Sequence, residues 1–403
     1  MAKSLAKNET ITAPLGFLAG SAAAGIKVSG KPDVGILAAT ELCSAAAVFT
    51  KNRFCGSPVV VGREHIRNGR LRAIVVNSGC SNVATGQRGI KDAREMCERV
   101  ADQLDARTAD VLPSSTGVIG VFLPMDKMRA GIDKAVASLS SSAAAGRGFA
   151  RAIMTTDLKI KQACERFRIG KTQYTVAGCC KGSGMIAPNM ATMLAYITTD
   201  AGLRPTELRP LLSAAAEHTF NRITVDECPS TSDTVVAMAS GLAGKLESSA
   251  ARATFAEVLR NVCDDLSYQI VADGEGATKV LEVRVQGAKT ATDAHAAARA
   301  IAVSPLVKTA VHGGDPNWGR IVQALGATNV TFSPEKVTVC LDRMVIFTKG
   351  SPAPRLDERK LAAIMKRKHV LIAIDLGAGR ASDRVLTCDL SREYIAINAD
   401  YHT

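Results

Sequence analysis

The chain has 403 residues, of which 47% are hydrophobic, 22% charged and only 4% aromatic, and its formal net charge at pH 7 is +12. This length exceeds what one core usually takes, so we expect two domains or one large domain with two lobes. The shortage of aromatic residues predicts a core of Ala, Val, Ile and Leu. The sequence holds no apolar run long enough to span a bilayer, and we expect a cytoplasmic protein.

The positive charge does not by itself predict a nucleic-acid-binding protein. Lysines and arginines are spread along the chain, and the densest group, KRKH at 366–369, ends an expected helix, where cations complement the helix dipole. We therefore expect small anionic metabolites as partners, and neither nucleic acid nor a membrane.

The eleven cysteines and six histidines are scattered along the chain. No two cysteines have the C-x-x-C spacing, and none lies beside a matching histidine, so we expect no metal site. An odd number of unpatterned cysteines indicates reduced, buried thiols. Nothing in the sequence calls for a cofactor.

Short β-branched segments bounded by Gly, Asn or Lys open the chain, and we predict strands at 34–40, 57–62 and 72–77. QRGIKDAREMCERVADQLD at 87–105 then predicts an amphipathic helix. Later helices are expected at 205–219, 252–267, 289–303 and 357–367. Later strands are expected at 234–240, 279–287, 336–342, 369–376 and 392–400. Ser/Ala/Gly-rich stretches at 137–149 and 244–253 are expected to be connectors.

Strands that follow one another directly in the second half favour an α+β layered architecture over a repeated βαβ fold. Within the chain, the segment KGSGMIAPNMATMLAYITTDA at 181–201 begins as a glycine-broken polar loop and ends as an alternating apolar run. Thr192 stands at the join of these two parts. A threonine that merely begins a strand would account for this pattern equally well.

Thr192 lacks the neighbouring histidine that usually activates a hydroxyl nucleophile. If the Ala191–Thr192 peptide bond were cut, the free α-amine of Thr192, with an ordinary pKa of about 8, would become a base beside its own hydroxyl. The Thr192 hydroxyl can make that cut by attacking the Ala191 carbonyl, and water then hydrolyses the ester. Gly182 and Gly184 would permit the strained approach that this attack needs.

The whole chain resembles the bifunctional ornithine acetyltransferase family, also called the glutamate N-acetyltransferase family. The processing motif of that family, KGxGMIxPNMATML, is matched at 181–194. Further matches, in order along the chain, are ITAPLGF, FTKNRF, PSSTGVIG, MTTD, DGEGATK, DPNWGR and INADYHT. The resemblance implies a layered, two-lobed fold that cuts itself before Thr192 into residues 1–191 and 192–403.

The resemblance also implies roles for single residues. PSSTGVIG is a turn with exposed N–H groups, and Thr116 and Gly117 would form the oxyanion hole for the nucleophile Thr192. Taken alone, this turn would be an ordinary surface turn, and Lys181 a solvated lysine. The substrate-binding residues that the resemblance implies are Thr155, Lys181, Thr192, Glu275, Asn398 and Thr403.

The implied reaction transfers acetyl from N2-acetyl-L-ornithine to L-glutamate through an acetyl-threonine ester, as a step of arginine biosynthesis. Acetyl-CoA remains open as a second donor, and the implied assembly is a heterotetramer of two N-terminal and two C-terminal chains. Two alternatives stay open. One is a self-processing aminopeptidase or amidase with the same nucleophile, and the other is a basic nucleic-acid-binding protein in which Thr192 is only structural.

Two segments depart from the family pattern. NSGCSNVATG at 77–86 has Cys80 where an amide is common, and TVDECPSTSDT at 224–234 has Glu227, Cys228 and Pro229 where Gly and Asp are common. These departures leave the processing motif intact but bear on substrate preference. In DPNWGR we favour the wall of an active site over a folding anchor as the role of Trp318.

Overall fold

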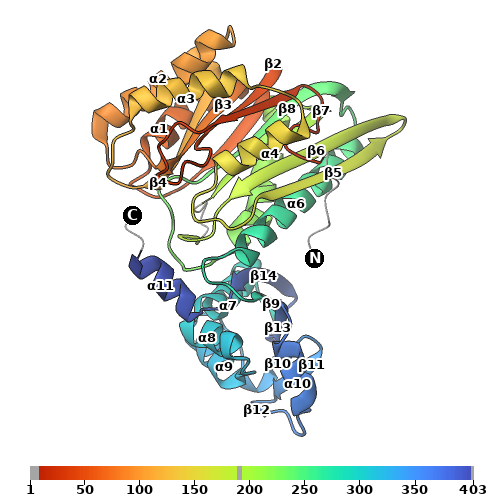
Figure 1. The fold of residues 1–403 in the computed structure, drawn as a ribbon. Helices are drawn as coiled ribbons and strands as arrows, with labels where there is room; N and C mark the ends of the chain where they lie inside the picture. The colour runs from red at the N-terminus through yellow and green to blue at the C-terminus, as the bar shows by residue number, and fades with distance from the viewer. Residues whose placement is uncertain (1–8, 188–192, 401–403) are drawn as a thin grey trace. The chain divides into compact units, whose positions relative to one another are not determined.

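The computed structural model describes residues 9–187 and 193–400 (Figure 1). They form two compact units. Of the described residues, the first unit contains those up to Asn221 together with Cys228–Ile270, and the second contains Arg222–Glu227 and residues 271–400. Each unit is a mixed sheet packed with helices, so the predicted α+β class is confirmed.

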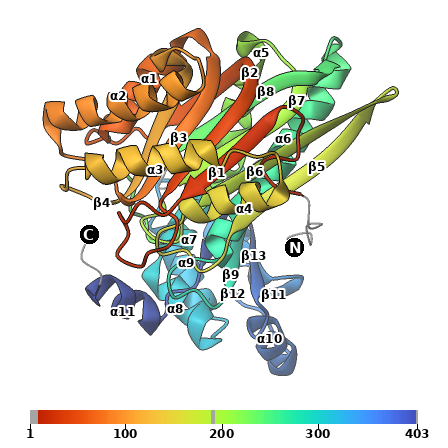
Figure 2. The same ribbon diagram turned by 45° about the horizontal axis from the view of Figure 1, so that its top comes forward.

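The first unit contains an eight-stranded sheet in the order β4-β3-β2-β8-β7-β6-β5, with β1 paired to β2 beside this path. β3 is parallel to β4 and β7 is parallel to β8, while the other neighbours are antiparallel. Figure 2 shows β2, β8 and β7 side by side in the sheet. The strands are β1 (Phe17–Ala22), β2 (Val34–Phe49), β3 (Arg70–Cys80), β4 (Val111–Val118), β5 (Lys161–Ile169), β6 (Thr172–Lys181), β7 (Leu194–Gly202) and β8 (Thr234–Lys245).

Alternating side chains of β2 and β3 enter two different cores, because successive side chains of a strand point to opposite faces. Ile36 and Val75 pack with α2 and α3, whereas Leu37 and Ile74 belong to the core that contains Phe149 of α4. Small aliphatic residues dominate both cores, as the composition predicts. The helices are α1 (Ser57–His65), α2 (Gly86–Gln103), α3 (Met125–Ala137), α4 (Ala143–Ala152), α5 (Pro205–His218) and most of α6 (Ser249–Ala272).

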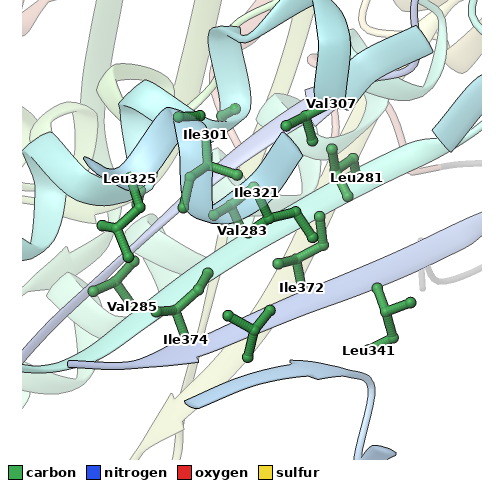
Figure 3. Packing of buried hydrophobic residues seen from close by; sticks show 14 of the residues in the cluster. Leu281, Val283, Val285, Ile301, Val307, Ile321, Leu325, Leu341, Ile372 and Ile374 are labelled. Carbon is green, nitrogen blue, oxygen red and sulfur yellow. The ribbon is translucent and has the colours of Figure 1, made fainter. Parts of the chain in front are cut away.

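The second unit contains a six-stranded sheet in the order β12-β11-β10-β13-β9-β14, in which β13 and β9 are parallel. Figure 3 shows side chains of β9 and β13 pointing toward side chains of α7, α8 and α9, which cover this sheet. The strands are β9 (Val280–Ala288), β10 (Thr338–Leu341), β11 (Met344–Thr348), β12 (Ser351–Pro352), β13 (His369–Asp375) and β14 (Ala381–Cys388). The helices are α7 (Ala291–Val303), α8 (Pro305–Gly313), α9 (Trp318–Gly326), α10 (Glu358–Met365) and α11 (Arg392–Asp400).

Trp318 is a folding anchor of this second unit. Its ring stacks on Phe347 with 5.4 Å between the ring centroids, and its side chain packs against the core. Asn317, the residue before it, caps α9 by accepting a hydrogen bond from the Arg320 N–H at 3.0 Å. The expectation that Trp318 forms the wall of an active site stays a prediction.

Two predicted strands are helices in the structure. The segment 57–62 lies in α1, because Gly56 is the N-cap residue and Pro58 occupies the first turn, where the proline lacks only an N–H that would be unbonded anyway. The segment 392–400 is α11, whose first turn is capped by the Ser391 hydroxyl on the Tyr394 N–H at 3.3 Å. Ile395 is 64% exposed, so the apolar alternation there does not reflect burial in a sheet.

The two expected connectors are largely regular structure. α3 ends at Ala137, and α4 begins at Ala143 with Ser142 as its cap, which accepts a hydrogen bond from the Ala145 N–H at 3.2 Å. Likewise, β8 runs to Lys245 and α6 begins at Ser249. Alanine favours helix strongly, so a serine followed by an alanine run starts a helix here.

No helix in the described residues combines the length and apolar character needed to cross a membrane. All eleven cysteines carry free thiols, and seven of them are buried. The expectation that the thiols are buried holds for these seven, whereas Cys228 is exposed. Within residues 9–187 and 193–400, His, Cys, Asp and Glu side chains form no cluster that could hold a metal ion.

Candidate active site

Gly117 lies near the end of β4, where the pairing with β3 becomes irregular. Cys80 pairs with both Thr116 and Val118, which marks a bulge around Gly117. Gly117 has a φ of 131°, and a Cβ at this position would lie 2.4 Å from the carbonyl carbon of Gly79. Only glycine fits this backbone approach, and bulges of this kind take backbone groups out of the regular ladder.

Thr116 lies beside this bulge on β4. It faces Lys181, which is the last residue of β6. Both side chains are buried, with exposures of 7% for Thr116 and 4% for Lys181, and the Lys181 Nζ lies 3.5 Å from the Thr116 Oγ1. An ammonium group can only donate, so the Thr116 oxygen accepts and its own proton is directed elsewhere. The alternative of Lys181 as a solvated surface lysine was wrong.

Asp157, on the loop between α4 and β5, connects the start of β5 with the end of β6. Its Oδ1 accepts hydrogen bonds from Lys161 Nζ at 2.6 Å and from Gly182 N at 2.7 Å, and its Oδ2 accepts from Thr155 N at 2.9 Å. Burial raises the pKa of Asp157, but the positive charges of Lys161 and Lys181 outweigh it and lower the pKa to about 2. The carboxylate therefore stays charged at neutral pH.

A third lysine, Lys27, lies near Asp157 and Lys181, on the loop that follows β1. The buried Asp33 carboxylate fixes this loop by accepting hydrogen bonds from Ala24 N at 2.6 Å and Ile26 N at 2.7 Å. Lys27 packs on β3, since a Cβ at Gly79 would meet its Cγ at 3.3 Å. Burial lowers the pKa of Lys27 to about 8, against the opposing pull of the Asp33 and Asp157 charges.

In the second unit, Glu275 and Asn398 come together. The Asn398 side chain on α11 donates from Nδ2 to the Glu275 Oε2 at 3.0 Å. The turn that carries Glu275 is held by the Ser391 hydroxyl, which donates to the Gly276 carbonyl at 2.7 Å. Gly276 has a φ of 68°, and a Cβ there would lie 2.5 Å from the Tyr394 nitrogen, so glycine allows this close packing.

Three predicted residues, Ala191, Thr192 and Thr403, lie outside the described residues. Met193 is the first described residue after Thr192. Its backbone N–H donates to the Oδ1 of Asp233 at 2.7 Å, and Asp233 is only 2% exposed. Burial raises the pKa of Asp233 well above its ordinary value, despite the Met193 N–H and the nearby charge of Lys181.

Cys80, one of the two departures from the family pattern, pairs with Thr116 and Val118 of β4. The sequence PSSTGVIG, predicted as a turn, thus begins as the second half of that strand. Its thiol donates to the Val121 carbonyl at 3.2 Å, and burial raises its pKa. The neighbouring Asn77 donates to the Cys80 carbonyl at 2.8 Å and accepts from the Ser115 hydroxyl at 2.6 Å. Cys80 therefore serves as a buried neutral group at the end of β3.

Glu227 marks the second departure. It has a φ of 62°, and its N–H donates to the Thr224 hydroxyl at 3.2 Å. The Arg299 guanidinium lies 3.7 Å from its carboxylate. Cys228, the next residue, is exposed.

Sequence reasoning missed Asp33, Asp157 and Asp233. Asp157 ends the matched MTTD motif, and Asp233 lies in TVDECPSTSDT, so both stood in quoted motifs. The only signal in the sequence was that these residues are carboxylic acids within polar motifs. Their burial, which requires a carboxylate to be paired or protonated, is seen only in the structure.

Comparison with known proteins identifies the family. The model of the ArgJ family matches residues 18–403. The arginine biosynthesis bifunctional protein ArgJ of Symbiobacterium thermophilum is 45% identical over 398 residues, which cover 98% of each chain. That of Geobacillus kaustophilus is 43% identical over 398 residues, covering 98% of this chain and 96% of the relative.

A solved structure is similar as well. The crystal structure of arginine biosynthesis bifunctional protein ArgJ from Bacillus halodurans is 40% identical, with a TM-score of 0.50. The match covers 52% of this chain and 100% of that chain. The protein described here thus belongs to the ArgJ family.

Proposed function

We propose that this protein transfers the acetyl group of N2-acetyl-L-ornithine to L-glutamate, through an acetyl ester on Thr192, as an enzyme of arginine biosynthesis. The relatives named as bifunctional proteins of that pathway support this proposal over nearly the full chain. The observation that carries it is the buried contact of the Lys181 ammonium with the Thr116 hydroxyl. Lys181 pairs with Leu194, two residues after Thr192 in the sequence.

The chain is proposed to cut itself before Thr192 into residues 1–191 and 192–403. The crystal chain from Bacillus halodurans supports this, because about half of the present chain accounts for all of it. Cleavage frees the α-amine of Thr192, whose ordinary pKa of about 8 suits a base near neutral pH. One residue then supplies both the nucleophile and the base.

Thr116 and Gly117 are proposed to stabilise the oxyanion that forms on the acetyl carbonyl. The Thr116 hydroxyl accepts from Lys181, which leaves its proton to donate to a developing negative charge. The bulge at Gly117, in the same part of β4, is proposed to supply a backbone N–H as the second donor. The positive charge of Lys181 behind Thr116 strengthens this donor.

The substrates are amino acids, so their binding needs a cation for the α-carboxylate and, for ornithine, an anion for the side-chain ammonium. Lys181 is proposed to bind the α-carboxylate. Thr155 is held near it by Asp157, whose carboxylate accepts hydrogen bonds from Thr155 N and from Gly182 N, next to Lys181. Glu275 is proposed for the ornithine ammonium, oriented by Asn398. Thr192 and Thr403 complete the set on the family resemblance alone.

Further parts of the proposal follow the family. Acetyl-CoA is proposed as a second donor, which would let the enzyme also make N-acetylglutamate. The processed chains are proposed to assemble as a heterotetramer, with two copies of each, in the cytoplasm. Eleven free thiols fit a reducing compartment.

A self-processing aminopeptidase or amidase would share the Thr192 nucleophile but pass the acyl group to water. Release of free acetate at the same rate with and without glutamate would favour that function. For the transferase, initial rates at several fixed glutamate concentrations should give parallel double-reciprocal lines, because ornithine leaves before glutamate binds. Intersecting lines would contradict the ester intermediate.

The cut itself is tested on the same protein. Denaturing electrophoresis and N-terminal sequencing should find a fragment that begins at Thr192. A Thr192→Ala variant should remain one chain and transfer no acetyl group, and Thr192→Ser should keep part of both activities. Fully active wild-type protein that consists only of uncut chain would overturn the proposal.

A further inference from the structure

The turn that carries Glu275 consists of residues 273–279, which join α6 to β9. It lies outside every helix and strand, so the regular hydrogen bonds of a helix or a sheet do not hold it in place. Backbone groups of such a segment need partners from elsewhere, and those partners decide which conformation the segment keeps. The residues that supply them therefore also decide where the Glu275 carboxylate lies.

Asp389, which directly follows β14, holds the end of this turn. Its Oδ1 accepts hydrogen bonds from the backbone N–H groups of Thr278 and Lys279, both at 2.8 Å, and its Oδ2 accepts from the Thr278 hydroxyl at 2.5 Å. In return, the Asp389 N–H donates to the Lys279 carbonyl at 3.2 Å. Because the Asp389 side chain is fully buried, these hydrogen bonds are shielded from water.

His312, near the end of α8, also contacts Asp389. Its Nδ1 lies 2.7 Å from Oδ2 of Asp389, and Nδ1 is the donor because a carboxylate can only accept. Burial raises the pKa of Asp389, but the hydrogen bonds from Thr278, His312 and Lys279 outweigh it and lower the pKa. The Lys279 ammonium donates to the Val311 carbonyl at 2.6 Å. The end of the turn is thus joined to α8 through two residues.

The segment that begins at Asp389 reaches Glu275 by a second route. The Ser391 hydroxyl donates to the Gly276 carbonyl at 2.7 Å. Ser391 directly precedes α11, so this bond places the start of that helix beside the residue that follows Glu275. The same helix carries Asn398, whose Nδ2 donates to the Glu275 Oε2 at 3.0 Å. The backbone of the turn and the side chain of Glu275 are therefore held by one segment of the chain.

We propose that Asp389 is a positioning residue for substrate recognition, which fixes the turn so that Glu275 meets the side-chain ammonium of the acetyl donor. This inference rests on the proposed function, in which Glu275 binds that ammonium. Asp389 does not itself touch the substrate, because it is buried and both of its oxygens accept hydrogen bonds from the protein. By holding the carboxylate in one place, it favours donors whose side chain ends in an ammonium over donors that lack one.

A double-mutant cycle on the full chain tests this role with the variants Asp389→Asn and Glu275→Gln. Asparagine keeps an oxygen for two N–H groups, but it has no charge and presents an NH₂ group to the Thr278 hydroxyl and to His312. KM for N2-acetyl-L-ornithine should rise about 3- to 10-fold in Asp389→Asn, up to the loss expected from removing the Glu275 charge itself. KM for glutamate should change less than about twofold, because glutamate has no side-chain ammonium.

The double variant gives a readout that a merely structural Asp389 would not move. With Glu275→Gln in place, adding Asp389→Asn should leave KM for N2-acetyl-L-ornithine unchanged, because the charge that Asp389 positions is already gone. A residue that only stabilises the fold would act independently, and the two effects on KM would multiply. Steady-state rates of the wild type, the two single variants and the double variant measure this coupling.

Thr278 allows a milder change, because it is exposed on the surface of the turn. Thr278→Val removes the hydroxyl that donates to Asp389 and should raise KM for N2-acetyl-L-ornithine about threefold. Thr278→Ser keeps a hydroxyl and should restore the wild-type value. If Asp389→Asn fails to fold, Thr278→Val takes its place in the cycle with Glu275→Gln.

Glu282→Gln is the matched control for the loss of a buried charge. Glu282 lies on β9, is buried, and its carboxylate lies 3.3 Å from the His369 imidazole. Glu282→Gln should lower the melting temperature, as Asp389→Asn does. It should leave both KM values unchanged, because its partners Arg284 and His369 lie on β9 and β13 and not on the turn.

The inference is overturned if KM for N2-acetyl-L-ornithine stays within about twofold of the wild type in Asp389→Asn and Thr278→Val, or if the two effects multiply in the double variant. It is also overturned if Glu275→Gln leaves this KM unchanged, because Glu275 would then bind no ammonium. In each case the wild type still transfers acetyl to glutamate, so the proposed transfer stands. A wild type that transfers no acetyl group would remove the proposed function itself, and this inference with it.

Discussion

The two polar clusters of this protein are built differently. In the first unit, Asp157 and Lys161 form an ion pair whose side chains are 0% and 1% exposed, and Lys181 lies beside them. In the second unit, Glu275 is half-buried and its partner Asn398 is exposed on α11. The first cluster is part of a sheet edge, whereas the second lies on a turn and a helix.

On the proposed function, the two clusters have different tasks. A buried ion pair contributes little net stability, but it is costly to break and holds its atoms in one arrangement. Such a cluster suits the part of a reaction where an oxyanion must meet donors that are already in place. A carboxylate that is only half-buried can adjust to a ligand, which suits recognition of a substrate's side chain. Each cluster can be tested separately.

The largest expected effect follows from breaking the buried pair. Asp157→Asn would leave the Lys161 charge buried without its counter-ion, which costs about 3–5 kcal/mol of the free energy of unfolding. Asp133→Asn is the matched control, because its ion pair with Arg99 is about 40% exposed and should cost about 1 kcal/mol or less. Urea denaturation of both variants measures the difference. Equal costs would show that the buried cluster is no more rigid than a surface pair.

The next effect concerns Thr116, the proposed oxyanion donor. Thr116→Ala removes the hydroxyl that accepts from Lys181, and kcat should fall about 10²- to 10³-fold, as for loss of one oxyanion donor elsewhere. Thr116→Ser keeps the hydroxyl and should retain most of kcat. Steady-state rates of the cut enzyme give the values. If KM changes and kcat does not, Thr116 binds substrate without stabilising the transition state.

A smaller effect is expected in the second unit. Glu275→Gln removes the charge proposed to meet the ornithine ammonium, so KM for N2-acetyl-L-ornithine should rise about 10-fold, which corresponds to about 1.4 kcal/mol. KM for glutamate should change little, because glutamate has no side-chain ammonium. Glu335→Gln, at an exposed carboxylate, controls for the loss of charge. A larger effect on kcat than on KM would place Glu275 with the first cluster instead.

The sequence predicted the regular parts of both units because strand and helix periodicities are local. It predicted β9 and β13 and the α2 helix within a few residues, since burial there follows the period of each element. It failed at 57–62, where three valines favoured a strand but Gly56 and Pro58 start a helix. The strand propensity of the valines was outweighed by the helix-start signal of Gly56 and Pro58.

The candidate site was only partly readable from the sequence. The sequence shows a glycine at position 117 but not why one is needed there. The reason is the close approach of its backbone to Gly79, 38 positions earlier. Asp157 and Asp233 act through contacts with Gly182 and Met193 that arise only when strand ends meet in the folded sheet. Such pairings have no local pattern, so single carboxylates in polar motifs gave no warning of their burial.

The smallest expected effect concerns Lys27 at the edge of the buried cluster. Its pKa is lowered to about 8 in the folded protein and is 10.5 when unfolded, so between these values the unfolded chain holds one more proton. Stability therefore rises with pH across this window, by on the order of 1 kcal/mol after allowance for solvent screening. Below pH 8 both states are protonated, and the folded state carries the full cost of burying the charge.

Lys27→Met should remove that rise. The free energy of unfolding of the wild type, measured relative to the Lys27→Met variant, should increase between about pH 8 and 10.5 and level off above this range. Lys134→Met, at an exposed position on α3, should follow the wild-type curve. A difference between wild type and Lys27→Met that stays constant with pH would mean that the ammonium of Lys27 is as well solvated in the folded protein as in the unfolded chain. The buried cluster would then include Lys161, Asp157 and Lys181 but not Lys27. The charge of Lys27, on the loop that Asp33 fixes, would have no measurable interaction with that cluster.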